Sequence, residues 1–299
     1  MKKFILFIVF IVSCIFCFGQ TADKYIKELT KKAKKGDVES MRYLGLRYQL
    51  GLDVEQNFTK AFEWYGKAAE KGDALAMSNL GMLYLYDDFR SEEKAFEWYA
   101  KAADKNEVWS MYMVGSFYYQ GKGCTQDYNE SFKWWEKAAE KGNEKAMNNL
   151  GDLYHDGKGV RQDYAKAFEW YEKSAKKGNK DAINNMGMMY YKGEGVEQDY
   201  KKAYELFTTV EDDIGFSKGF LSEMYYNGYY VKKDYNRAFV MAKEGAEHET
   251  NPSGTAMRIL SACYRYGLGG ASIDKEKSEY WLKESANHND EKAISALGL

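Results

Sequence analysis

The sequence contains almost no proline, and Pro252 is its single occurrence in 299 residues. Proline interrupts helices because it lacks a backbone N–H and clashes with the preceding turn. Its scarcity therefore leaves long stretches in which helices can continue. Glycine is frequent, at 27 residues, and must supply many of the chain reversals. Together these features indicate a regular array of helices joined by glycine turns.

Neither sign of charge is in excess, because 43 basic residues stand against 45 acidic ones and the formal net charge is −2. Proteins that bind the phosphate backbone of nucleic acids usually carry a basic excess, so we expect no nucleic-acid partner. Hydrophobic residues make up 45% of the chain and aromatic residues 16%. A chain of this length and composition is ordered and can bury a substantial core.

Long apolar runs are also missing, apart from residues 4–18 near the N-terminus, which follow Lys2 and Lys3. A basic start, a short apolar stretch and a small residue before the cut are typical of a secretory signal peptide. The run falls short of the roughly 20 residues that span a bilayer. We therefore expect residues 1–19 to be a signal peptide that is cleaved after Gly19.

Cleavage at that point would release a periplasmic or secreted chain without a membrane span. Two alternatives remain open. Residues 11–14, Ile-Val-Ser-Cys, loosely resemble a lipoprotein box, so Cys14 could carry a lipid and anchor the protein to a membrane. The leader could also be retained uncleaved as an anchor.

After the leader, the chain repeats itself with a period of about 36 residues. Residues 146–160 (AMNNLGDLYHDGKGV) align without a gap with residues 182–196 (AINNMGMMYYKGEGV). A second block, Ala-Phe-Glu-Trp-Tyr, recurs at 61–65, 95–99 and 167–171. We place seven repeats in residues 36–288, beginning near Gly36, Gly72, Asn106, Gly142, Gly178, Asp213 and Thr250.

Both blocks of each repeat have the apolar spacing of a helix. In the first block Ala146, Leu150 and Leu153 fall at i, i+4 and i+7 and form one stripe. The second block ends in lysines before Gly178, which suits the helix dipole and a left-handed cap. The repeating unit is predicted to be a helical hairpin, helix A followed by helix B. We expect residues 20–35 and 289–299 to form capping helices at the two ends.

These residues resemble the Sel1-like repeat family, whose units read as a small residue, Leu-Gly-x-Leu-Tyr, Gly-x-Gly-Val, Asp-Tyr and then Ala-x-x-Trp-Tyr-x-Lys-Ala-Ala. The seven repeats cover about 85% of the chain. The resemblance implies an all-α fold, a right-handed α-solenoid of antiparallel helix pairs, and an adaptor or scaffold role without a cofactor. Independently, each hairpin can bury its apolar faces only against its neighbours, so the array exposes a long surface suited to a protein or peptide partner.

The variable positions of helix A are the candidate contact surface, if helix A lines the concave face as in related helical-repeat families. They mix aromatic, amide and carboxylate groups, and in the sixth repeat they are Gly219, Glu223 and Tyr226. We predict a groove over repeats three to six. The alternative is that these side chains are merely solvated or pack on neighbouring repeats. The candidate partner-binding residues are Tyr112, Ser116, Tyr119, Asn148, Asp152, His155, Asn184, Met188, Tyr191 and Tyr226.

Four tryptophans recur at one position of helix B, and we interpret them as core residues rather than a sugar-binding row. They are Trp64, Trp98, Trp134 and Trp170. The alternative function is an envelope glycan-binding module or hydrolase. A glycan-binding protein should expose these tryptophans in its groove, whereas a peptide-binding protein should bury them and expose the helix A stripe.

The sequence offers no catalytic centre. Its three histidines, His155, His248 and His288, lie in different repeats and lack a metal-ligand spacing such as H-E-x-x-H, so we expect neither an enzyme nor a metal site. Only Cys124 and Cys263 would remain after cleavage. Four repeats separate them, which is too far for a disulfide, since that bond needs Cα atoms within about 7 Å. Stability must come from packing alone.

Overall fold

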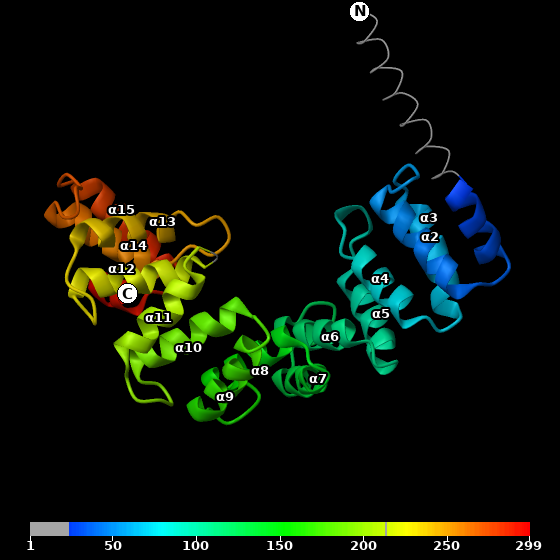
Figure 1. The fold of residues 1–299 in the computed structure, drawn as a ribbon, viewed down its shortest axis with the longest axis horizontal. Helices are drawn as coiled ribbons and strands as arrows, with labels where there is room; N and C mark the ends of the chain where they lie inside the picture. Colours follow the sequence, from blue (N-terminus) through cyan, green and yellow to red (C-terminus); the bar gives the residue numbers. More distant parts are fainter. Residues whose placement is uncertain (1–23, 213) are drawn as a thin grey trace, which may run out of the picture. The chain divides into compact units, whose positions relative to one another are not determined.

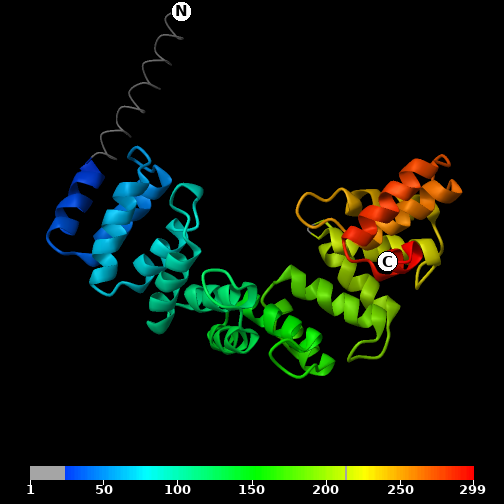
Figure 2. The ribbon, with the colours of Figure 1, turned by 180° about the vertical axis from the view of Figure 1, so that it is seen from behind.

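The computed structural model describes residues 24–212 and 214–299, and all regular secondary structure within these ranges is helical. The predicted all-α fold is thus confirmed. The predicted signal peptide, residues 1–19, lies outside the described residues. The chain divides after Asn143 into two compact units, each built from antiparallel helix pairs (Figures 1 and 2).

The first unit begins with a helix over residues 24–34, whose Leu29 and Ala33 enter the core of the first repeats. Three helix pairs follow, and a 3-10 turn replaces the glycine loop of the second pair. The elements are α2 (Val38–Leu50), α3 (Phe58–Glu70), α4 (Ala74–Leu83), η1 (Asp87–Phe89), α5 (Glu92–Asp104), α6 (Val108–Gln120) and α7 (Tyr128–Glu140).

The second unit contains four helix pairs and one last short helix. In it α14 packs against α12, α13 and α15, and α16 packs against α15. The elements are α8 (Glu144–Asp156), α9 (Tyr164–Ala175), α10 (Lys180–Lys192), α11 (Tyr200–Val210), α12 (Gly215–Asn227), α13 (Tyr235–Ala246), α14 (Gly254–Tyr266), α15 (Lys275–Asn287) and α16 (Glu291–Leu297).

The loop between the helices of a regular pair is held by the residues that recur in the sequence. Gly157 ends helix α8 with a φ of +69°, a left-handed conformation that favours glycine. Gln162 then donates from Nε2 to the carbonyl oxygen of His155 at 2.8 Å. Asp163 caps α9 by accepting the backbone N–H of Lys166 at 3.0 Å. These three contacts fix where helix B starts relative to the end of helix A.

In most pairs the two helices approach closely because a helix A glycine lies under an aromatic ring of helix B. A Cβ on Gly151 would stand 2.5 Å from the Tyr171 ring, and Tyr171 itself is only 1% exposed. The same contact occurs in five pairs. The glycine–ring pairs are Gly45–Tyr65, Gly81–Tyr99, Gly115–Trp135, Gly151–Tyr171 and Gly187–Phe207.

The tryptophans predicted as core residues each precede, by one residue, the aromatic side chain of helix B that is buried. Trp64, Trp98, Trp134 and Trp170 are each half-buried. In every case the lysine three residues later covers the indole, with Nζ 4.0–4.4 Å from the ring centroid. Successive residues of a helix point about 100° apart, so the residue after the tryptophan takes the core position instead. The tryptophans border the core rather than form it.

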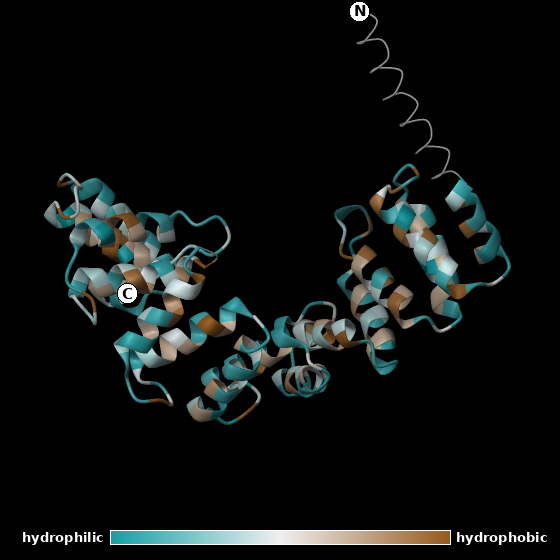
Figure 3. Cartoon of the chain, viewed as in Figure 1, coloured by the Kyte–Doolittle hydropathy of each residue, from teal (hydrophilic) through white to brown (hydrophobic). Residues whose placement is uncertain are grey.

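Figure 3 shows the hydrophobic residues concentrated on the helices, while much of the connecting loops is hydrophilic. Two of the connecting segments depart from the regular loop. In the shortened second repeat, Phe89 of η1 lies against Phe62 with ring centroids 5.0 Å apart. Pro252 lies in the longer loop between α13 and α14. Both Cys124 and Cys263 are free.

Candidate partner-binding site

In the first unit, the predicted contact residues of α6 lie against their own helix pair. The Ser116 hydroxyl donates to the carbonyl oxygen of Tyr112 one turn earlier, at 3.0 Å. The Tyr119 ring packs on Tyr128 and Trp135, with centroids 5.3 and 5.4 Å apart. Tyr112, Ser116 and Tyr119 are all half-buried, so each keeps some surface available to solvent.

In the second unit, Asn148 and Asp152 belong to a hydrogen-bonded network between α8, α9 and α10. One Asp152 oxygen accepts from the Tyr171 hydroxyl at 2.8 Å and from Asn185 Nδ2 at 3.3 Å. The other accepts from Asn148 Nδ2 at 3.2 Å. Burial raises the pKa of Asp152 to about 6, although the Tyr171 hydrogen bond favours the ionised form. The network joins neighbouring repeats through polar contacts.

Three of the predicted contact residues are not solvent-facing. Asn148 and Asn184 are each 7% exposed and Tyr191 is 8% exposed, so the expectation of an exposed stripe is wrong for these residues. Asn184 Oδ1 accepts the Ser217 hydroxyl at 2.8 Å. The helices of adjacent repeats approach closely enough to cover this part of helix A. A simple helical pattern does not distinguish solvent from the next repeat.

The remaining predicted residues have intermediate exposure. His155 contacts Asp156 through Nδ1 at 3.0 Å and Glu194 through Nε2 at 3.1 Å. The Tyr226 ring packs edge-on against Tyr235, with centroids 5.5 Å apart. Met188 is half-buried on α10. These side chains are distributed along the unit and do not converge on one point.

A cavity of about 250 Å³ opens beside Tyr191, where helix A of the fifth, sixth and seventh repeats meets the start of α16. The Tyr191 ring packs on Phe220 with centroids 5.1 Å apart. Its hydroxyl is inaccessible to solvent and makes no hydrogen bond of good geometry, although it interacts with the nearby Glu223 carboxylate. Burial, and then the nearby Glu223 carboxylate, raise the pKa of Tyr191. The cavity is lined by Tyr191, Lys192, Phe220, Glu223, Thr255, Arg258, Asn289, Asp290, Glu291 and Lys292.

The charged groups of this cavity are tied to one another. Glu223, only 3% exposed, accepts from Arg258 at 3.0 Å and also pairs with Lys292. Arg258 in turn contacts Asp290 at 2.9 Å. Burial alone would raise the pKa of Glu223, but Arg258 and Lys292 outweigh burial and hold the pKa below its ordinary value. These ion pairs hold the charged side chains of the walls in a fixed geometry.

Of the predicted contact residues, only Tyr191 lines this cavity, next to Glu223 of the same stripe in the sixth repeat. Sequence reasoning missed Arg258, Asp290 and Lys292. Arg258 has a detectable signal, because extending the repeat register into the seventh repeat places it at the position of Asn148. Asp290 and Lys292 follow the last complete repeat, so aligning the repeats does not identify them.

The part of the chain that the structure describes contains no group of three His, Cys, Asp or Glu side chains arranged to hold a metal ion. Within the same residues, no helix is both long enough and apolar enough to cross a membrane.

A family model described as Sel1 repeat matches seven segments of the chain, residues 38–73, 74–107, 110–143, 144–179, 180–209, 219–249 and 254–290. The chain belongs to the Sel1 repeat family. Proteins with Sel1 repeats generally act as non-catalytic scaffolds or adaptors for other proteins. The matched segments confirm the resemblance seen in the sequence, and the repeat number is seven as predicted.

Two solved structures are similar over nearly the whole chain. One is c5321, a protective antigen of uropathogenic Escherichia coli strains with an SLR fold, at 31% identity and a TM-score of 0.73 over 90% of this chain and 58% of that one. The other is a Sel1 repeat protein from Oxalobacter formigenes, at 25% identity and a TM-score of 0.68 over 94% of this chain and 81% of that one. Both support an all-α array of helix-pair repeats.

A shorter match connects the chain to a eukaryotic protein. The ERAD-associated E3 ubiquitin-protein ligase component HRD3A of Arabidopsis thaliana is 36% identical over 63 residues, which is 21% of this chain and 9% of that protein. The chain thus matches only a small part of this curated relative. The match agrees with the family assignment.

Proposed function

We propose that this protein is a scaffold that binds a segment of a partner protein at the cavity between α10, α12, α14 and α16. The observation that carries the proposal is the Tyr191 side chain, which lines that cavity and whose buried hydroxyl makes no hydrogen bond of good geometry, although the Glu223 carboxylate lies nearby. A buried polar group left without a partner costs about 1–3 kcal/mol. A bound partner that supplies a donor or acceptor would recover part of this free energy.

The surroundings of Tyr191 support a binding role. Glu223, Arg258 and Asp290 hold one another in place, so a ligand meets walls that need little reorganisation. Preorganised sites bind more tightly because less ordering accompanies binding. A cavity of about 250 Å³ suits one side chain and its backbone rather than a whole cofactor. The proposed ligand is therefore a peptide segment that inserts one polar side chain.

The test uses peptides selected from a random displayed library on the full chain, followed by affinity measurements on two variants. Tyr191→Phe removes the unpartnered hydroxyl and keeps the ring. Tyr190→Phe is the matched control, because Tyr190 is next along α10 but lies with Phe168 and Lys202 on another face. We expect Tyr191→Phe to weaken peptide binding by about five- to tenfold, corresponding to one net hydrogen bond, without lowering stability.

Selected peptides that bind both variants as tightly as the unchanged chain would remove the Tyr191 cavity from the proposal. Failure to select any peptide, together with binding to a glycan array, would favour the glycan-binding alternative. The half-buried tryptophans speak against that alternative, because a lysine already occupies one face of each indole. The wider groove over repeats three to six, including Tyr112, Ser116 and Tyr119, stays a prediction.

We also propose that the protein is exported. The support is the pattern of residues 1–19, in which Lys2 and Lys3 precede a short apolar run. Expression of the full chain in a bacterium, followed by fractionation and N-terminal sequencing, tests this proposal. A periplasmic or secreted product that starts at Gln20 is expected. A product that retains residue 1 in the cytoplasm would refute export, and a lipid on Cys14 would establish the lipoprotein alternative.

A further inference from the structure

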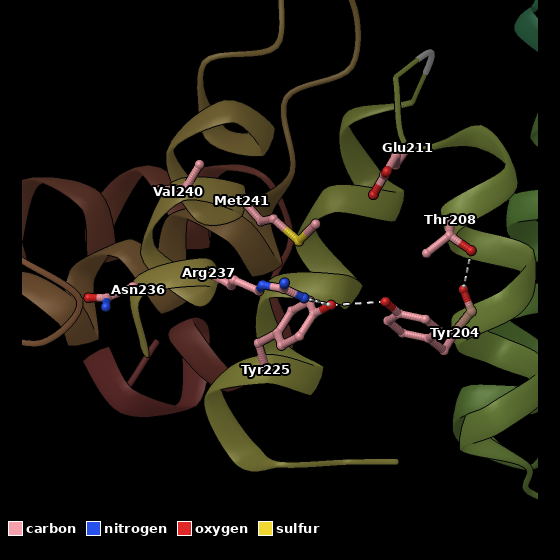
Figure 4. Close-up of a pocket in the computed structure, with 8 residues that line it drawn as sticks. All are labelled: Tyr204, Thr208, Glu211, Tyr225, Asn236, Arg237, Val240 and Met241. Atoms are coloured by element: carbon pink, nitrogen blue, oxygen red, sulfur yellow. Dashed lines mark hydrogen bonds between the residues drawn. The ribbon is translucent and has the colours of Figure 1, made fainter. Parts of the chain in front are cut away.

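A second cavity, of about 450 Å³, lies between α11, α12 and α13. Figure 4 shows that its side chains come from three directions, with Glu211 just beyond the end of α11, Tyr225 on α12 and Met241 on α13. Tyr204, Thr208, Asn236, Arg237 and Val240 complete the lining. None of these residues lines the Tyr191 cavity.

The cavity coincides with a departure from the repeat pattern. In the register of helix B, Glu211 stands where the first three repeats have Ala69, Ala103 and Ala139. Those alanines are only 2–3% exposed. A carboxylate cannot be covered in the same way without a compensating partner. The substitution therefore accompanies a cavity at a position where the first three repeats have a buried alanine.

Positive charge does not compensate the Glu211 carboxylate. Its Oε2 atom is inaccessible to solvent and has no hydrogen-bond partner. Burial, and then the neighbouring Asp212, raise the pKa of Glu211. Lys218 acts in the opposite direction, but its ammonium group is paired with Glu244 at 2.7 Å. Glu244 also contributes negative charge near Glu211. The carboxylate thus lies in an acidic environment, and Lys218, the cation that acts on it, is already paired with another carboxylate.

The cation on the opposite side of the cavity is already engaged. Arg237 donates to the Tyr225 hydroxyl at 3.1 Å and lies 3.7 Å from Asp234. The Tyr225 hydroxyl also shares a 2.9 Å hydrogen bond with Tyr204. In the view of Figure 4, Met241 lies between Arg237 and Glu211. The lining thus combines the apolar Met241 side chain, a satisfied polar group and an unsatisfied carboxylate.

We propose that this cavity binds a lysine side chain of a partner protein, with the methylene stem against Met241 and Val240 and the ammonium group on Glu211. A lysine combines an aliphatic stem with a compact positive charge, which matches these walls. The guanidinium of arginine prefers to engage both oxygens of a carboxylate, so a single buried, unpartnered oxygen favours lysine. The inference does not depend on the Tyr191 cavity, and its test needs no natural partner.

The test titrates capped tripeptides, Gly-Lys-Gly and Gly-norleucine-Gly, into the full chain labelled with ¹³C at the methionine methyl groups. Norleucine keeps the stem and removes the ammonium group. We expect the lysine peptide to shift the Met241 resonance, which a Met241→Leu variant assigns. It should bind about tenfold more tightly than the norleucine peptide, the size of one charge-assisted hydrogen bond.

Glu211→Gln should reduce lysine-peptide affinity at least about fivefold. Glu205→Gln is the matched control, because it makes the same charge change on the exposed side of α11 and should leave the affinity within about twofold. Equal affinity for the two peptides, no shift of Met241, or equal effects of the two variants would overturn the proposal. Tighter binding of a Gly-Arg-Gly peptide would overturn the assignment to lysine.

Discussion

Replacing Gly151 by alanine should destabilise the second unit, although alanine is the better helix former. The added Cβ would stand 2.5 Å from Cδ1 and Cε1 of Tyr171 and 3.0 Å from its Cζ. Carbon atoms in contact prefer about 3.5–4.0 Å, so the ring has to move by roughly 1 Å. Tyr171 is 1% exposed and its hydroxyl is bonded to Asp152. The ring therefore has no free volume into which it can move without loss.

The expected cost combines three effects. Overpacking a well-packed core costs about 1–3 kcal/mol. Displacing the ring also weakens its hydrogen bond to the buried Asp152 carboxyl, which adds about 1–2 kcal/mol. The gain in helix propensity from glycine to alanine offsets about 1 kcal/mol. We therefore expect the free energy of unfolding of the second unit to fall by about 1–4 kcal/mol.

Urea denaturation monitored by circular dichroism measures this change, and hydrogen exchange of the α8 and α9 amides localises it to the repeat. Gly66→Ala is the control, because Gly66 lies inside α3 and a Cβ there would meet nothing within 4 Å. The control should raise stability by up to about 1 kcal/mol. If Gly151→Ala stabilised the protein as much as Gly66→Ala, the close contact between helix A and the ring would be refuted as a determinant of packing.

Three further predictions follow from buried ionisable groups. Because burial raises the pKa of Asp152 to about 6 from an ordinary 3.8, its contribution to stability is complete below pH 4 and is lost as the pH rises through 6. Between pH 4 and pH 7, the free energy of unfolding of the Asp152→Asn variant should thus rise by up to about 3 kcal/mol relative to that of the unchanged chain, as measured by urea denaturation. Stability profiles that run parallel over this pH range would contradict the prediction. Arg258→Leu should lower the free energy of unfolding by about 3 kcal/mol, because it leaves the buried Glu223 without its main partner. A change below about 1 kcal/mol would be inconsistent with a buried ion pair. Burial raises the pKa of Cys263 to about 11, so iodoacetamide at pH 8 should modify the partly exposed Cys124 well before Cys263, as peptide mapping by mass spectrometry would reveal.

The helix pairs could be predicted from the sequence because their determinants are local and repeated. Gly157, Gln162 and Asp163 recur in register in several repeats, and each makes a contact within its own pair. Residues that recur at the same position of several repeats can therefore be recognised as structural from the sequence. The same recurrence misplaced the tryptophans, since the 36-residue period identifies an important position without showing which of two adjacent aromatics, Trp170 or Tyr171, enters the core.

The candidate sites could not be predicted in the same way. Glu223, Arg258 and Lys292 belong to three different helices, and their contacts depend on how those helices stack. Asn184 has the polar character of an exposed residue, yet Ser217 of the next repeat buries and satisfies it. The lysine-binding cavity is the exception, because the replacement of a recurring alanine by Glu211 is visible in the aligned repeats.

The hydrogen bonds that close the repeats have a consequence for how the chain acquires its structure. Gln162 and His155 are 7 residues apart, Tyr171 and Asp152 are 19 apart, and Asn185 and Asn148 are 37 apart. Chains dominated by contacts at short sequence separation fold fast, since little loop entropy is lost before each contact forms. Lys292 and Glu223, 69 residues apart, are the long-range pair. We therefore expect contacts within helix pairs and between neighbouring pairs to form early, and the attachment of α16 to α12 to be the slow step that completes the second unit.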